Sequence, residues 1–285
     1  MNSGSPRSAT VSSTSPVRDA EQGPIVVGVD GTKTAARACS WSASLAEASR
    51  RRLVVAHAYH VGDFANGPDS AAASSIEELT RWMITTDTGG LPDEHITTTV
   101  VSGQAGPALI EATAAYGASL LVLGAPHVGA IAPHGLGRVV QHTTSRSPRP
   151  IAIVRGLGGP PARSPLLVGV DPVNTNLEAV NWSFALAGTL GVPLEVLTVS
   201  DDSKAIDNVE ALLASLVSAT GPVVDLFATE GDPADELMKR AEEIDASTVV
   251  VGQKRRHNLD GRIMGHVPSK MIYQSRRPVV LVSQR

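Results

Sequence analysis

The chain has 285 residues, of which 42% are hydrophobic and 18% are charged, so it holds enough apolar material for two ordinary domains or one large one. A formal net charge of -4 and a pI near 6.1 exclude a long-range positive field that would attract nucleic acid or an acidic membrane. The single cysteine, Cys39, excludes an intramolecular disulfide and a multi-cysteine metal site, and favours a reducing compartment.

Residues 1–23 are rich in Ser, Thr and Pro and are predicted to form a disordered tail. They contain no apolar run long enough for a secretory signal. Elsewhere, too, no apolar run approaches the roughly eighteen residues that a membrane helix requires. We therefore expect a cytoplasmic protein without membrane contact.

Short β-branched runs alternate with longer amphipathic stretches from residue 24 onward. The runs predicted as strands are, in chain order, IVVGV, LVVAHA, TTTVV, LLVLG and IAIV, followed by LLVGV, LEVLTV, VVDLFA, VVVG and VVLV. Each is almost continuously apolar, as expected for strands covered on both faces. Alternation of strand and helix predicts parallel sheets with right-handed crossovers.

The stretch after the first strand has the period of a helix. Ala38, Trp41, Leu45 and Ala48 recur at steps of three and four residues and so share one helical face. The corresponding stretch of the second set carries the predicted face Ala179, Trp182, Leu186 and Thr189. Cys39 lies in the first of these helices and is expected to be a small core side chain.

The two sets of strands are copies of one another. Asp30 and Asp171 are 141 residues apart, as are Trp41 and Trp182, whereas Gly124 and Gly252 are 128 apart. The first copy is therefore longer by 13 residues (141 − 128), which we place in loops between about residues 60 and 100.

The Gly- and Pro-rich stretch RGLGGPPARSP between the copies is typical of a linker. The sequence thus predicts a first domain over 24–155, a linker over 156–164 and a second domain over 165–285. Ligands of such folds sit beyond the carboxyl ends of the strands, where the strand order reverses.

Asp30 and Asp171 follow the first strand of each copy. A carboxylate there could accept hydrogen bonds from a ribose hydroxyl or hold a metal bound to phosphate, or it could cap the following helix. Gly124 and Gly252 end the fourth strands, and Gly137 and Gly265 follow 13 residues later. Glycines at these places allow close approach to a ligand, and a helix N-terminus offers N–H groups to phosphate.

These features together resemble the universal stress protein family in its tandem two-domain form. The resemblance is carried by VGVDGT and VGVDPV, by Trp41 and Trp182, by HA at 57–58, and by the prolines before both last strands. It implies an α/β protein with two tandem Rossmann-like (adenine nucleotide alpha hydrolase-like) domains. Each would be a five-stranded parallel sheet with helices on both faces, and the domains would pack like two subunits of a dimer.

The ATP-binding members of that family carry Gly, two residues, Gly, nine residues, then Gly followed by Ser or Thr. The resemblance implies these cofactor-binding residues: Val29, Asp30, Gly124, Gly137, Val170, Asp171, Gly252 and Gly265. The pattern fails twice in each copy, because His127 and Arg255 replace the second glycine, and Arg138 and His266 replace the hydroxyl residue. Pro126 and Pro268 remove further backbone donors. The phosphate cradle is therefore predicted to be degenerate in both halves, which puts ATP binding in doubt.

The replacements leave a basic loop that can be interpreted in three ways: a solvated surface, a rearranged anion site, or a docking surface for a macromolecule. Its cations are Arg138, Lys254, Arg255, Arg256, Arg262, His266 and Lys270. Nucleic acid is disfavoured because the loops lack aromatic residues for stacking. The spacing of His127, His134 and His142 suits no metal site, and no nucleophile motif is present.

We therefore expect a nonenzymatic stress-response regulator with protein partners and no metal or catalytic residues. The alternatives are an ATP- or AMP-binding sensor with a rearranged site, and a scaffold without nucleotide. If one site survives, we favour the first half, because its loop keeps more glycines and Gly31 follows Asp30, although the second half keeps more cations. Homo-oligomers are possible through the edge strands.

Overall fold

The computed structural model describes residues 23–60, 68–126, 137–155, 164–216, 221–254 and 264–284. All ten predicted strands are present in these ranges. They are β1 (Ile25–Val29), β2 (Leu53–Tyr59), β3 (Ile96–Ser102), β4 (Leu120–Gly124), β5 (Ile151–Val154), β6 (Leu166–Val170), β7 (Leu194–Val199), β8 (Val224–Thr229), β9 (Thr248–Gln253) and β10 (Val279–Ser283).

The helices connect the strands as the alternating pattern predicts. They are α2 (Lys33–Ser49), α3 (Pro68–Ile84), η2 (Asp93–His95), α4 (Ala105–Ala115), α5 (Arg138–Arg146), α6 (Leu177–Leu190), α7 (Ser203–Leu216), α8 (Pro233–Glu243) and α9 (His266–Gln274). The predicted linker, except for Ser164, and the predicted tail, except for Gly23, lie outside the described residues.

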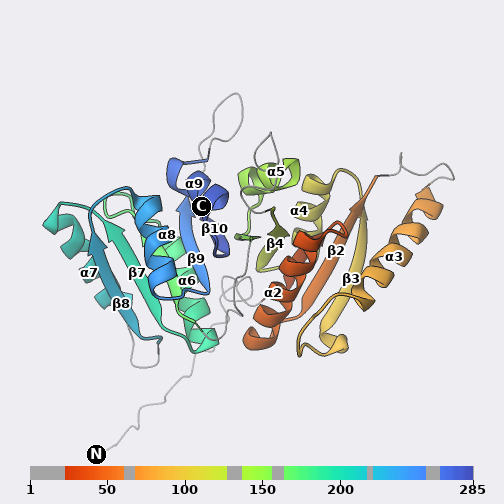
Figure 1. The fold of residues 1–285 in the computed structure, drawn as a ribbon, viewed down its shortest axis with the longest axis horizontal. Coiled ribbons are helices and arrows are strands. Elements are labelled where there is room, and N and C mark those ends of the chain that lie inside the picture. The colour runs from red at the N-terminus through yellow and green to blue at the C-terminus, as the bar shows by residue number, and fades with distance from the viewer. Residues whose placement is uncertain are drawn as a thin grey trace, which may run out of the picture.

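The strands form one sheet in the order β3-β2-β1-β4-β5-β10-β9-β6-β7-β8. Within each half all neighbours are parallel, which confirms the predicted doubly wound class. The halves lie side by side and join edge to edge through β5 and β10 (Figure 1), which pair antiparallel with Ala152 opposite Val280. The sequence did not predict that the two five-stranded sheets would be continuous.

Helices cover both faces of the sheet, as expected. Buried side chains of α2, α3, α6 and α7 share one hydrophobic core, and those of α4, α5, α8 and α9 share the other. Neighbouring strand residues alternate between the cores, as Ile25 and Val26 do, which explains why the strands are apolar throughout. Burial of a β-branched run on both faces is the main reason these segments form strands.

Most of the predicted first-helix face is buried. Trp41 and Leu45 on α2 and Trp182 and Leu186 on α6 lie in the shared core, and Cys39 is fully buried, as expected. The prediction for Thr189 was wrong. It is exposed, and its hydroxyl donates to the carbonyl of Ala185 one turn earlier, so α6 turns this position to solvent.

Two polar bonds tie the halves together across the join. The Gln253 side-chain amide, at the end of β9, donates to the carbonyl of Thr144 on α5 (3.0 Å). Arg155, just after β5, donates to the carbonyl of Tyr273 on α9 (2.9 Å). Each half thus anchors the last helix of the other.

Candidate functional site

Each half has a cavity where β1 and β4, or β6 and β9, end side by side. The cavity in the second half has a volume of about 530 Å³, whereas that in the first half has about 100 Å³. Both lie at the place where the strand order reverses, as the fold class predicts. Small-molecule sites usually have volumes of about 300–1,000 Å³, so only the second cavity is of that size.

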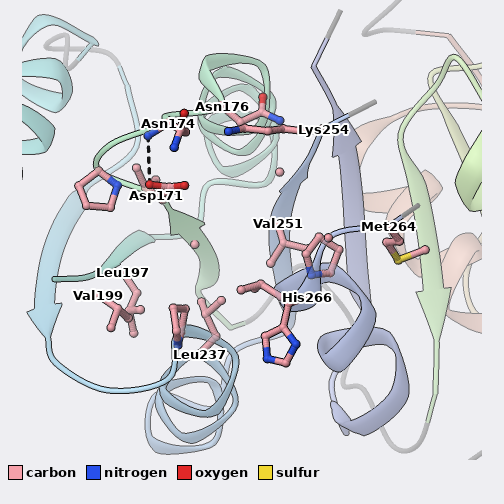
Figure 2. A pocket seen from close by; sticks show the side chains of 18 residues that line it. Asp171, Asn174, Asn176, Leu197, Val199, Leu237, Val251, Lys254, Met264 and His266 are labelled. Atoms are coloured by element: carbon pink, nitrogen blue, oxygen red, sulfur yellow. Dashed lines mark hydrogen bonds between the residues drawn. The ribbon is translucent and has the colours of Figure 1, made fainter. Parts of the chain in front are cut away.

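The second cavity has an apolar wall and a polar rim. Leu197, Val199 and Leu237 gather on one side of it in Figure 2, and Asp171 and Asn174 come from the loop between β6 and α6. Lys254, after β9, and His266, the first residue of α9, also line the cavity. An apolar surface with a few polar groups is typical of a site for a small organic ligand.

Seven of the eight predicted cofactor-binding residues line a cavity, and three pairs of them do so at corresponding positions of the two halves. Val170, Asp171, Gly252 and Gly265 line the large cavity, together with His266. In the first half Val29, Asp30 and Gly124 line the small cavity, whereas Gly137 and Arg138 do not. The structure therefore brings the predicted residues of the second half together more completely than those of the first.

The two strand-end aspartates hold the loops that follow them. One Asp171 carboxylate oxygen accepts the backbone N–H groups of Val173 (2.9 Å) and Asn174 (3.0 Å). Asp30 accepts both the N–H (3.1 Å) and the hydroxyl (2.6 Å) of Thr32. Neither aspartate caps a helix itself, because Thr32 caps α2 and Asn176 caps α6. The second oxygen of each carboxylate has no bond to any residue that the structure describes.

The first helix starts later in the second half, and this difference enlarges the cavity. Relative to the shared strand positions, α6 begins three residues after the start of α2. Gly31 has a φ of +77°, which lets the chain turn at once into α2. Pro172 occupies the corresponding position and cannot adopt a positive φ, so the loop after β6 takes a longer path.

Gly124 and Gly252 are required by packing whether or not a ligand binds. A Cβ on Gly124 would collide with the backbone of Thr34 in the first turn of α2. A Cβ on Gly252 would lie 2.6 Å from the Cβ of Asn176. Their occurrence in both copies is therefore explained by the approach of the first helix to the fourth strand.

Gly137 and Gly265 have no such requirement in the described residues. They precede α5 and α9 with φ values of -54° and -62°, which any residue can adopt, and neither helix has a side-chain cap. No described atom lies within 4 Å of a Cβ built on Gly137, and only the Pro268 ring, at 3.6 Å, is near one on Gly265. The space beside Gly265 opens onto the cavity.

Some of the cations predicted for the basic loop lie against carboxylates. Lys270 on α9 bonds to Asp232 (3.0 Å) and Asp235 (2.7 Å) on α8, and His266 Nε2 lies 3.5 Å from Asp232. Lys254 and Arg138 are exposed. The remaining members, Arg255, Arg256 and Arg262, lie outside the described residues, as do His127 and His134.

Sequence reasoning missed Asp232, which lies beside two cavity-lining residues, Pro233 of α8 and His266 of α9. It caps α8 by accepting the N–H groups of Ala234 (3.1 Å) and Asp235 (3.0 Å). The bond from Lys270 and those from the backbone lower its pKa to about 2, so its carboxylate is charged at neutral pH. The sequence Asp-Pro before an amphipathic stretch signals such a cap, but not the contact with α9.

Two helices beside the first cavity, α4 and α5, pack closely together. His142 on α5 packs directly over Gly106 on α4, where an added Cβ would lie 2.8 Å from the imidazole ring. Burial, reinforced by Arg146, lowers the pKa of His142, so its ring is neutral near pH 7. The second half has Ala234 and Lys270 at these positions, and Lys270 reaches Asp232 and Asp235 instead.

Other chemistry is not indicated by the described residues. Across these ranges, no three His, Cys, Asp or Glu side chains are grouped so that they could hold a metal ion. Burial raises the pKa of the Cys39 thiol to about 12, which makes it a poor nucleophile. None of the helices in the same ranges combines the length and apolar character needed to cross a membrane.

Comparisons with known proteins agree with this architecture. A sequence model of the Universal stress protein family matches residues 23–155 and 202–283. Universal stress protein Rv2005c of Mycobacterium tuberculosis is 26% identical over 291 residues, which cover 91% of this chain and 97% of that protein. A universal stress protein structure from Archaeoglobus fulgidus covers 93% of this chain and 100% of its own, with a TM-score of 0.75 and 16% identity, and so shares the fold.

Proposed function

Because the chain belongs to the universal stress protein family, we propose that it is a nonenzymatic regulatory protein whose second half binds a small adenine-type ligand. The observation that carries this proposal is the cavity of about 530 Å³ at the ends of β6 and β9. Its apolar wall suits a flat ring, and its polar rim suits a ribose. The first half, with a cavity of about 100 Å³, would serve as structural support and not as a second site.

A nonenzymatic role is supported by the chemistry of the lining. The residues that the structure places around the large cavity include no Ser, Thr, Cys or Tyr that could act as a nucleophile. The degenerate phosphate loops of both halves also favour ligand sensing over phosphoryl transfer. We expect the ligand to change the affinity of the protein for a partner, and we expect the protein to act in the cytoplasm.

The test is calorimetric titration of the purified chain with adenosine, AMP and ATP. Val267 lines the large cavity and Val139 occupies the corresponding place in the small one, so they form a matched pair. Val267→Phe should place a bulky ring inside the large cavity and weaken binding, whereas Val139→Phe should leave binding unchanged. Melting curves would show that both variants are folded.

Other outcomes would lead to different conclusions. Binding that survives Val267→Phe but is lost in Val139→Phe would place the site in the first half. No heat with any of the three ligands at millimolar concentration would reject the proposal and favour a protein-interaction scaffold. Val173 and Leu177, which are exposed beside the cavity, would then be the first residues to test for partner binding. Release of phosphate from ATP at a steady rate would contradict the nonenzymatic role.

A further inference from the structure

We propose that the cavity of the second half selects adenine ligands with at most one phosphate, because Asp232 and Asp235 oppose a polyphosphate chain at its α8–α9 end. This inference depends on the proposed function, since it names the ligand class of the same cavity. It concerns residues that the family pattern does not include.

The first step is the position of the negative charge. Asp232 directly precedes Pro233 and lies 3.5 Å from the imidazole of His266, and both of these neighbours line the cavity. Asp235 lies one turn further along α8 and, like Glu236, belongs to the acidic first turn of that helix. The N-terminus of α9, where a phosphate chain would be expected, therefore faces carboxylates.

The second step is the balance of charge among the described residues of α8 and α9. Lys270 bonds to both Asp232 and Asp235, and Lys239 pairs with Glu236 (3.5 Å). Three carboxylates thus face two ammonium groups among these residues. Pro268 at the third position of α9 also removes one of the N–H groups that a helix N-terminus would offer to an anion.

The third step is the contrast with the opposite rim and with the first half. Lys254 lines the cavity after β9 and has no ion pair to any described residue, so it can accept a single phosphate. In the first half Gln104 and Pro107 occupy the positions of Asp232 and Asp235. The carboxylates are therefore a property of the half that contains the large cavity.

The experiment compares the dissociation constants of adenosine, AMP and ATP, measured without magnesium, for the full chain. We expect AMP to bind about tenfold more tightly than ATP, or more. The triphosphate of ATP carries several negative charges, and each is repelled by the carboxylates across several ångströms of solvent. The variant Asp232→Asn/Asp235→Asn should reduce that ratio to about threefold or less. Asn keeps the capping oxygen of residue 232, so the fold of α8 should survive.

The control variant is Asp207→Asn/Glu210→Gln, which removes the same charge from exposed positions of α7 on the other face of the sheet. It should leave the ratio of the AMP and ATP affinities unchanged. Raising the salt concentration should lower the ratio for the natural chain and have little effect on Asp232→Asn/Asp235→Asn, because salt screens the repulsion.

The outcomes separate this inference from the proposed function. If no adenine ligand binds, both are overturned. If AMP and ATP bind equally well, or ATP binds more tightly, the proposed function stands and this inference is wrong. Arg255, Arg256 and Arg262 would then be the residues to test as phosphate ligands. A ratio that the double variant does not change would likewise overturn the role of the two aspartates.

Discussion

The two halves have the same strand order but differ in how closely helices approach the strand ends. In the first half α2 begins directly after a glycine turn, and α5 packs onto α4 through His142 and Gly106. In the second half α6 begins three residues later, and ion pairs of Lys270 span α8 and α9. A few local changes in a duplicated fold are thus sufficient to leave one cavity large and the other small.

The strongest test of this comparison is addition of a methyl group at the end of the fourth strand. Gly124→Ala should lower the free energy of unfolding by about 3 kcal/mol, because its Cβ meets helix backbone that cannot move away. The three atoms nearest to a Cβ on Gly252 all belong to the side chain of Asn176, so Gly252→Ala should cost about half as much, on the order of 1.5 kcal/mol. Urea denaturation followed by circular dichroism would measure both. Equal losses would contradict the closer helix approach in the first half.

The two bonds across the join offer the next comparison. Gln253→Leu should cost about 2 kcal/mol, because it leaves the buried carbonyl of Thr144 without its donor. Arg155→Met should cost less, since burial already lowers the pKa of Arg155 and its Nε has no partner among the described residues. The same denaturation experiment would rank the two losses, and a larger loss for Arg155→Met would contradict the expectation that the Gln253 bond contributes more to stability.

Helix packing beside the first cavity can be tested by a double-mutant cycle. Gly106→Ala should cost about 1–2 kcal/mol through its collision with His142. The variant Gly106→Ala/His142→Ala should recover about 1 kcal/mol of that loss. In the second half the matched substitutions are Ala234→Gly and Lys270→Ala. Their effects on the free energy of unfolding should be additive. Coupling of similar size in both halves would show that this contact does not distinguish them.

The core position of Cys39 gives a prediction about pH. Burial raises its pKa from 9.0 to about 12, so between these values the unfolded chain loses a proton that the folded chain keeps. Stability should therefore fall as pH rises through this window, by at most about 1.4 kcal/mol per pH unit from this group. Val180 occupies the corresponding position of the second half. Cys39→Val should remove this component, as shown by the difference between the pH profiles of the two proteins.

The smallest expected effect concerns the uncapped starts of α5 and α9. Gly137→Asp should stabilise the protein by about 0.5 kcal/mol, because an aspartate there can cap the N–H groups at the second or third helical position. Gly265→Asp should gain less, since Pro268 has no N–H at the third position of α9. Thermal melting would show the order, and an equal gain would mean that the proline does not limit capping.

Most of the fold could be predicted because its strands are buried on both faces. Continuously apolar runs such as LLVLG and VVVG are suited to strands in the middle of a covered sheet, and the two offsets of 141 and 128 residues fix which strand of one copy corresponds to which of the other. The antiparallel join of β5 and β10 could not be predicted, because nothing in either strand specifies its partner beyond its own half.

The site was less predictable, because it depends on contacts between distant residues. Asp171 and Gly252 were found from their place at the strand ends and Gly265 from the glycine spacing that both copies share, and all three line the large cavity. The pairing of Asp232 with Lys270, 38 residues apart, has no local signal. The difference in cavity volume follows partly from Pro172, which occupies the position of Gly31 in the second half. The sequence predicts that a proline there changes the loop, but only the structure shows that α6 starts later as a result.

The order of the strands at the join has a consequence for synthesis of the protein on the ribosome. β5 can pair with β10 only after residues 155–278 have been translated, because β10 follows them in the chain. Until then the completed first half carries an open β5 edge with unpaired backbone groups, which is prone to pair with other chains. Cotranslational folding of this protein therefore includes an interval in which a chaperone or a second nascent chain can compete with β10 for that edge.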